Sequence, residues 1–184
     1  MSKIRLTVIA VAALLMFPFP AAAADIAKIG VVDVQKILLT SSVGKLAKAS
    51  MNKKAREMEA SLNARKEEID KLKEELEREA LVMSQEKREE RDREIRIKIN
   101  DIKSLKNRYE EELKAIEGKV VRRIQKDVDD IVQEMGKSEG YLLIISNPVV
   151  MYAPAAIDLT DELIERYNKV FAEQGGTIDI DKLE

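Results

Sequence analysis

A regular pattern of apolar and charged residues dominates the middle of the chain, from residue 45 to residue 136. Apolar residues recur there every three or four positions, which is the spacing of one helix face. The second of two stripes begins at Ile95, ends at Met135 and has the mean step of a straight helix, about 3.6 residues. The first has the alternating steps of a coiled-coil seam, with Arg65 and Glu79 in two of its places: Met51, Ala55, Met58, Leu62, Ile69, Leu72, Leu76 and Met83.

The gap between the two stripes, residues 84–94, contains no apolar residue. One helix running through the gap would measure roughly 135 Å, at about 1.5 Å per residue, and would hold the two ends of the chain apart. Each end segment is too short to form a core alone, because chains below about 40 residues seldom fold unaided. We therefore expect an antiparallel helical hairpin over residues 45–136, with its tip near 84–93 and arms of roughly 60 Å.

The segments that flank this hairpin, residues 25–44 and 137–172, are apolar and rich in β-branched residues, which is typical of strands. In the first segment, a strand through residues 29–32 is expected to lead into Asp33, which can cap a short helix over residues 34–39. The predicted fold class is α+β, mostly helical, with a small β-rich body at the base of the long hairpin.

The second flanking segment begins with a strand, Tyr141–Ile145, whose unbroken apolar run is typical of strands buried on both faces. After a turn at Asn147–Pro148, residues 149–152 are expected to form another strand. Thr160 marks the start of a last helix, because two acidic residues follow it near the positive end of the helix dipole. Residues 173–184 contain two glycines and several acids, so we expect a flexible acidic tail.

The β-rich body is small, and cores of about 60 residues are marginal without help. Association of several chains at the body would supply the missing burial, and a closed ring would satisfy every subunit equally. A monomer with an ordinary antiparallel hairpin is the alternative. The residues expected to mediate oligomerisation are Ile29, Val31, Val32, Leu142, Leu143, Ile144, Ile145, Val149 and Val150.

Residues 1–24 have the three-part pattern of a secretory signal peptide. Two basic residues precede an apolar run over residues 6–19, and small residues follow at 21–24, with cleavage expected near Ala24. A membrane anchor is the weaker interpretation, because the run is shorter than the ~20 residues that a bilayer requires and contains Pro18. The sequence therefore predicts export across the inner membrane to the periplasm.

The composition argues against several classes of function. The chain has no cysteine and no histidine, so a zinc site or a nucleophile–base pair would be very hard to build. We expect no catalytic residues, no metal site and no cofactor. Aromatic residues make up 4% of the chain, and the hairpin carries 24 basic and 23 acidic residues. Nucleic-acid binding is not expected, because it requires a basic surface or a stacking platform.

Candidate binding residues lie on the first arm and before the tip. Met51 and Met58 carry flexible thioethers, which adapt to varied apolar partners. The run Ala80-Leu81-Val82-Met83 spans more than one helical turn, so not all of it can face one partner helix. We expect these residues to contact apolar parts of varied partners; packing within the hairpin is the alternative.

Two further features of the hairpin are open to interpretation. Basic residues near the tip either contact an anionic surface or form a solvated helix face with nearby acids: Lys87, Arg88, Arg91 and Arg93. Gly118 lies inside the second predicted helix. Other residues are more favourable than glycine in a helix interior, by up to about 1 kcal/mol. We hypothesise a flexible point or a close approach of neighbouring arms at Gly118.

These residues resemble a known family, the Skp (OmpH-like) periplasmic chaperones. The resemblance extends over nearly the whole chain, from Ile29–Val34 to Asp158–Thr160, and is strongest in Asn147–Pro154. It implies a homotrimer in which strands of three subunits form a shared β-barrel body, with the hairpins as tentacles around a cavity. It also implies that unfolded outer-membrane proteins are held there without ATP and passed towards the outer-membrane assembly machinery. Members of the family are strongly basic, whereas this hairpin is nearly neutral, which weakens the case for a membrane-surface contact.

The sequence thus predicts a non-enzymatic, ATP-independent holdase chaperone of the periplasm. The rival hypothesis is a structural coiled-coil scaffold or adaptor of the cell envelope with one fixed partner. The apolar run over residues 80–83 favours the holdase, because a static scaffold has less reason to expose it.

Overall fold

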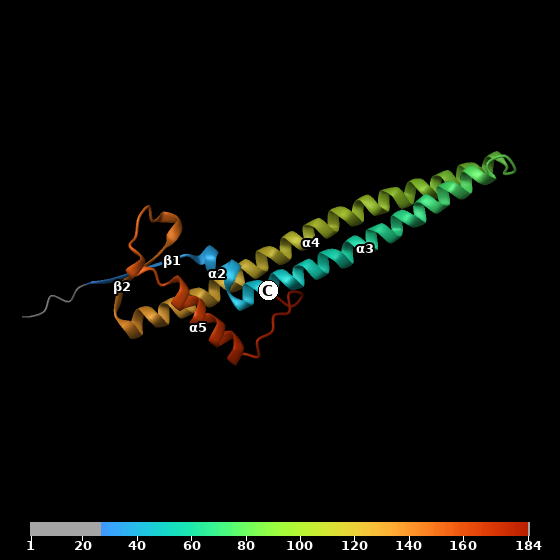
Figure 1. Ribbon diagram of the computed structural model, residues 1–184. Helices are drawn as coiled ribbons and strands as arrows, with labels where there is room; N and C mark the ends of the chain where they lie inside the picture. The colour runs from blue at the N-terminus through green and yellow to red at the C-terminus, as the bar shows by residue number, and fades with distance from the viewer. Residues whose placement is uncertain (1–26, 184) are drawn as a thin grey trace, which may run out of the picture.

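The structure is a computed structural model that describes residues 27–183; it is mostly helical with a small sheet. Two long helices lie side by side and project from a small body that holds the sheet and the shorter helices (Figure 1). The predicted signal peptide, residues 1–24, lies outside the described residues. In chain order the elements are β1 (Lys28–Val32), α2 (Val34–Thr40), α3 (Ser42–Glu79), α4 (Gln85–Glu139), β2 (Tyr141–Ser146), the 3₁₀ turns η1 (Asn147–Val149) and η2 (Ala155–Ile157), and α5 (Thr160–Glu173).

The long hairpin is formed by α3 and α4. Polar pairs also link the two arms: the Lys98 ammonium lies 2.8 Å from the Glu68 carboxylate, and the Tyr109 hydroxyl lies 3.4 Å from the Ser61 hydroxyl. No helix within residues 27–183 has an apolar stretch long enough to cross a bilayer. Burial along the arms follows the two apolar stripes read from the sequence, and the stripe residues buried there are Met58, Ile69, Ile95, Leu105, Ile116, Val120, Ile124, Val128, Ile131 and Met135.

The turn between the arms lies at residues 80–84, slightly before the predicted tip at residues 84–93. Ser84 accounts for the difference, because its hydroxyl accepts a hydrogen bond from the backbone N–H of Lys87 at 3.4 Å and so caps α4. The charged run after Ser84 therefore forms the first turns of α4 rather than a loop.

Gly118 lies within a continuous helix, because α4 runs without interruption from Gln85 to Glu139. A Cβ added at Gly118 would meet only the Arg122 guanidinium, at 3.4 Å. Gly118 therefore does not mark a close approach of α3 within one chain, and the flexibility hypothesised for it stays a prediction.

The body contains a parallel two-stranded sheet in which Ile29 of β1 pairs with Leu143 of β2. Parallel strands need a long crossover connection, and α2, α3 and α4 together provide it here. The other edge of β1 bridges to Asp158, and the N–H of Leu159 donates to the Val31 carbonyl at 2.9 Å. Both edges of β1 are thus occupied.

One prediction about the body is corrected. Residues 149–152 do not form a strand: Asn147–Val149 is a 3₁₀ turn, and the chain is irregular from there to η2. The local reason is the 3₁₀ turn itself, in which the N–H of Val150 donates to the Asn147 carbonyl at 2.8 Å, while Pro148 has no N–H to donate to a sheet. The described part of one chain supplies two strands and no closed barrel, and the barrel shared between subunits stays a prediction.

The core of the body lies where α2 and α5 meet the inner ends of α3 and α4, around the fully buried Ile124 and Leu163. The predicted cap of α2 is confirmed, because the Asp33 carboxylate accepts a hydrogen bond from the N–H of Lys36 at 2.9 Å. Thr160 begins α5 as predicted, but its hydroxyl accepts from the N–H of Asp33 at 2.9 Å instead of capping its own helix. Thr160 thereby ties α5 to the end of β1.

The last described residues, 174–183, pack against the base of the hairpin, and we call them the strap. Gly175 and Gly176 have positive φ angles of 100° and 62° and turn the chain after α5, so that the strap returns beside α3 (Figure 1). Ile180 is 6% exposed and joins the core, and Ile178 is partly buried against it. These residues therefore dock through their few apolar side chains, whereas a solvated tail was expected, and the flexibility of this segment stays a prediction.

Gly44, in the first turn of α3, offers a test of the packing between α2 and α3. A Cβ at this position would lie 1.9 Å from the backbone carbonyl oxygen of Leu38, which cannot rotate away. We expect Gly44→Ala to lower the free energy of unfolding by about 2 kcal/mol or more, measured by urea denaturation. Gly136→Ala is the matched control, because nothing lies within 4 Å of its added Cβ, and it should stabilise α4 by about 0.5–1 kcal/mol. Similar effects of the two substitutions would contradict this account.

Candidate functional site

The end of the hairpin presents an apolar turn to solvent. Leu81 and Val82 are 97% and 86% exposed, whereas Ala80 and Met83 are half-buried. The N–H groups of Val82 and Met83 donate to the Glu79 carbonyl at 3.0 and 3.1 Å and hold the turn in place. Half of the predicted binding run is thus freely accessible, and the other half helps to end the first arm.

The predicted basic residues near the tip lie on the first turns of α4, and all four are exposed: Lys87, Arg88, Arg91 and Arg93. Arg91 pairs with Glu94 at 3.0 Å. Lys87 and Arg91 also line a shallow hollow together with Glu79 and Glu90. The tip therefore has mixed charge and not a basic patch, as expected for a helix face whose charges are paired along the chain.

The two methionines of the first arm are largely covered. Met58 is 8% exposed, and Met51 is partly buried against the core of the body. Met58 therefore contributes to packing, which was the alternative interpretation of its place in the stripe. Met51 retains some accessible surface.

Exposed apolar side chains gather on the sheet and on the loop that follows it, namely Ile29, Leu142, Leu143, Val149, Met151 and Tyr152. Leu142 is 75% exposed, so the predicted burial of β2 on both faces is wrong for a single chain. The cause is that the sheet has two strands only in the described chain, and nothing covers this side of β2. The remaining residues predicted for oligomerisation are buried or half-buried: Val31, Val32, Ile144, Ile145 and Val150.

The outer edge of β2 has no strand partner among the described residues, since β2 pairs with β1 alone. Parallel sheets usually have both faces covered, and an isolated pair of strands is marginally stable. The open edge and the apolar side chains beside it form a surface to which a further strand can be added.

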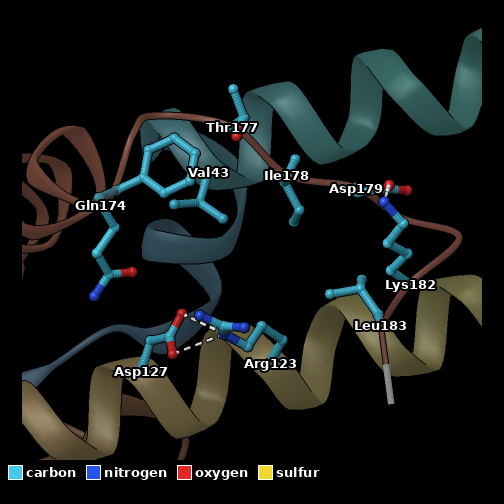
Figure 2. Close-up of a pocket in the computed structure, with 10 residues that line it drawn as sticks. Val43, Arg123, Asp127, Gln174, Thr177, Ile178, Asp179, Lys182 and Leu183 are labelled. Atoms are coloured by element: carbon cyan, nitrogen blue, oxygen red, sulfur yellow. Dashed lines mark hydrogen bonds and ion pairs between the residues drawn. The ribbon is translucent and has the colours of Figure 1, made fainter.

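A cavity of about 260 Å³ lies at the base of the hairpin, between the strap, α5 and the inner ends of α3 and α4 (Figure 2). Arg123 of α4 places its Nε 2.9 and 3.0 Å from the two carboxylate oxygens of Asp127. Asp127 also accepts a hydrogen bond from the Tyr167 hydroxyl at 3.0 Å. Burial raises the pKa of the Tyr167 hydroxyl above its ordinary value, and the negative charge of Asp127 raises it further.

Two lysines connect the strap to the hairpin. The Lys54 ammonium of α3 contacts the Asp181 carboxylate of the strap and lies 2.8 Å from the Glu112 carboxylate of α4. The hydrogen bonds to Asp181 and then to Glu112 raise the pKa of Lys54. Lys119 of α4 donates to the backbone carbonyl of Leu183 at 2.6 Å. This set of contacts joins both arms and the strap at one place.

The strap and its lysines are functional candidates that the sequence analysis did not predict. The signal that could have found them is the alternation of Ile178 and Ile180 with Asp179 and Asp181, which is the pattern of an extended segment with one buried face. The neighbouring glycines and the acidic composition pointed to a solvated tail instead.

Comparisons with known proteins agree with this architecture. The structure is similar to the crystal structure of a candidate outer membrane chaperone (OmpH-like) from Caulobacter crescentus CB15, with a TM-score of 0.75 and 18% sequence identity, over 78% of this chain and 85% of that chain. At this identity the similarity concerns the fold. No curated protein matches the chain. Residues 28–167, which include both strands and the whole hairpin, match the family described as Outer membrane protein (OmpH-like), and the chain therefore belongs to this OmpH-like family.

Proposed function

We propose that this chain is an ATP-independent holdase chaperone of the periplasm. It binds unfolded outer-membrane proteins and prevents their aggregation during transit to the outer membrane. Membership of the OmpH-like family supports the proposal, and so does a fold shared with a protein named as a candidate outer membrane chaperone. The function requires binding only, without a catalytic step or a cofactor.

The observation that carries the proposal is the exposed apolar turn at the end of a long, charged hairpin. Leu81 and Val82 contribute little to the stability of a single chain, because apolar area stabilises a protein when it leaves water. An unfolded barrel protein offers alternating apolar side chains along an extended backbone. Distributed apolar contacts suit such a client better than one shaped pocket does. A fixed envelope scaffold, the rival hypothesis, has no use for an uncovered apolar end.

We further propose that three chains associate through their bodies, with the three hairpins as tentacles around a shared cavity. The unpaired edge of β2 and the exposed Leu142 and Leu143 support this, because strand pairing between subunits would extend the sheet and bury these side chains. A closed ring leaves no such edge open, and a barrel of strands from three subunits would be one such closure. Clients would then pass from the cavity to the outer-membrane assembly machinery.

The mixed charge of the tip supports a weak contact with a membrane surface at most. Exposed basic side chains there have acidic neighbours, as in the Arg91–Glu94 pair. Balanced charges attract an anionic surface poorly, and salt screens the remainder. We therefore assign the tip to apolar client contact in preference to lipid headgroups.

A dilution assay tests the holdase proposal. A urea-denatured outer-membrane barrel protein, diluted into buffer without ATP, should scatter much less light when the chain is present. Leu81→Ser with Val82→Ser removes apolar contact area and should reduce the binding free energy of the client by about 1.4 kcal/mol. This loss corresponds to an affinity about tenfold weaker. Leu39→Ser changes an exposed leucine of α2, far from the tip, and serves as the control. Scattering unaffected by the wild-type chain would refute the holdase, and binding of a single folded partner would favour the scaffold.

The subunit association is tested by native mass spectrometry. The wild-type chain should have three times the mass of one chain. Leu142→Glu with Leu143→Glu places two charges beside the open edge of β2 and should shift the population to monomers, because burying unpaired charges is strongly unfavourable. Leu39→Glu is the matched control and should leave the mass unchanged. A monomeric wild-type chain would overturn the assembly proposed for the body.

A further inference from the structure

The strap lies on the base of the hairpin as a separate peptide would. Within the described residues, no backbone hydrogen bond connects residues 177–183 to any other element. Its attachment depends on the apolar side chains of Ile178, Ile180 and Leu183, which pack against the core of the body, and on polar contacts from two lysines. A segment attached through side chains alone can open locally without unfolding of the whole chain, so the strap can be released separately from the hairpin.

The surface beneath the strap, which we call the seat, offers three kinds of contact. Its apolar part continues the body core, and Val43 of α3 lines the cavity next to the strap. Lys54 is mostly buried and binds a carboxylate. Lys119 binds a main-chain carbonyl, a group that every polypeptide carries. Of these contacts only the one from Lys54 depends on an acidic side chain, so the seat is suited to many sequences.

The sequence of the strap indicates what the seat accepts. Ile178 and Ile180 alternate with Asp179 and Asp181; residues 177–179 have neither helical nor strand pairing, and a turn follows in which the N–H of Lys182 donates to the Asp179 carbonyl at 3.3 Å. Alternation of apolar and polar side chains is also the pattern of outer-membrane barrel strands, which place lipid-facing and lumen-facing residues in turn. The strap lies beyond residues 28–167, the part of the chain that matches the family.

We propose that the seat binds unfolded polypeptide segments in which apolar side chains alternate with carboxylates, and that the strap is its built-in, displaceable occupant. This inference rests on the proposed holdase function and adds to it a site at the base of the hairpin, distant from the apolar tip. The tethered strap competes at a high effective concentration, so a single weak segment is excluded. A client that presents many such segments displaces the strap and gains a second point of attachment.

Peptide binding to the full-length chain tests the seat. The probe is a fluorescein-labelled peptide with the sequence of residues 174–184, and the readout is fluorescence anisotropy. Ile178→Ser with Ile180→Ser releases the strap, and this variant should bind the probe at least tenfold more tightly than the wild type does. Ile97→Ser makes the same chemical change at an exposed position in the distal part of α4 and should bind as the wild type does. A probe with both isoleucines replaced by serine should not bind.

A second variant keeps the test valid if the serine variant is misfolded. Gly176 has a φ of 62°, a conformation that β-branched residues rarely adopt, so Gly176→Val should release the strap without changing a docked side chain. Equal probe affinity for the released variants and the wild type, or no binding to the released variants, would overturn the peptide seat.

The assignment of the seat to clients has its own readout. An unfolded outer-membrane barrel protein should displace the labelled probe from the released variants and should bind them several-fold more tightly than it binds the wild type. If the probe binds but the client fails to displace it, the client assignment is overturned and the strap is a structural clasp. Light scattering with the wild-type chain reports separately on the holdase function, so the two failures are distinguishable.

Discussion

Burial of the two apolar stripes between α3 and α4 keeps the hairpin closed, and this closure positions the other parts of the described chain. The stripe of α4 continues from residues such as Ile95 near the tip to Ile124 and Met135 at the base, where it merges with the core of the body. Because the hairpin returns the chain to its starting point, β1 and β2 can pair, although both long helices separate them in sequence. The exterior of the arms is then free to carry charge, and the turn at their end is free to be apolar.

The sequence allowed the parts governed by periodicity and capping to be predicted. The two stripes indicated the two helices, and Asp33 indicated the short helix that follows β1. The parts that failed depend on contacts that local patterns do not encode. Residues 149–152 have strand-like composition, but the chain enters a 3₁₀ turn at Asn147, and the N–H of Val150 donates to the Asn147 carbonyl. The strap was missed because its glycines and acids dominate its composition, whereas Ile180 decides where it lies.

The surfaces of the molecule fall into two groups with different physical requirements. At the body, an unpaired strand edge and exposed leucines favour strand pairing with another chain, which is specific in register and direction. At the tip and in the seat, small apolar surfaces lie beside charged side chains, and they favour contacts of low specificity. A protein that assembles precisely with itself but holds varied partners loosely needs both kinds of surface. The long hairpin places the tip far from the body, whereas the seat lies beside the body at the base of the hairpin.

The pairing of β1 with β2 has a consequence for the order in which the chain acquires its structure. A polypeptide that emerges amino-terminus first exposes β1 long before β2 exists, so this apolar strand must wait unpaired. Closing so large a loop from a random coil is entropically costly, whereas zipping of the two helices from their local turn brings the strand ends together stepwise. The nascent chain is thus most vulnerable to self-aggregation in the interval before the second helix is complete.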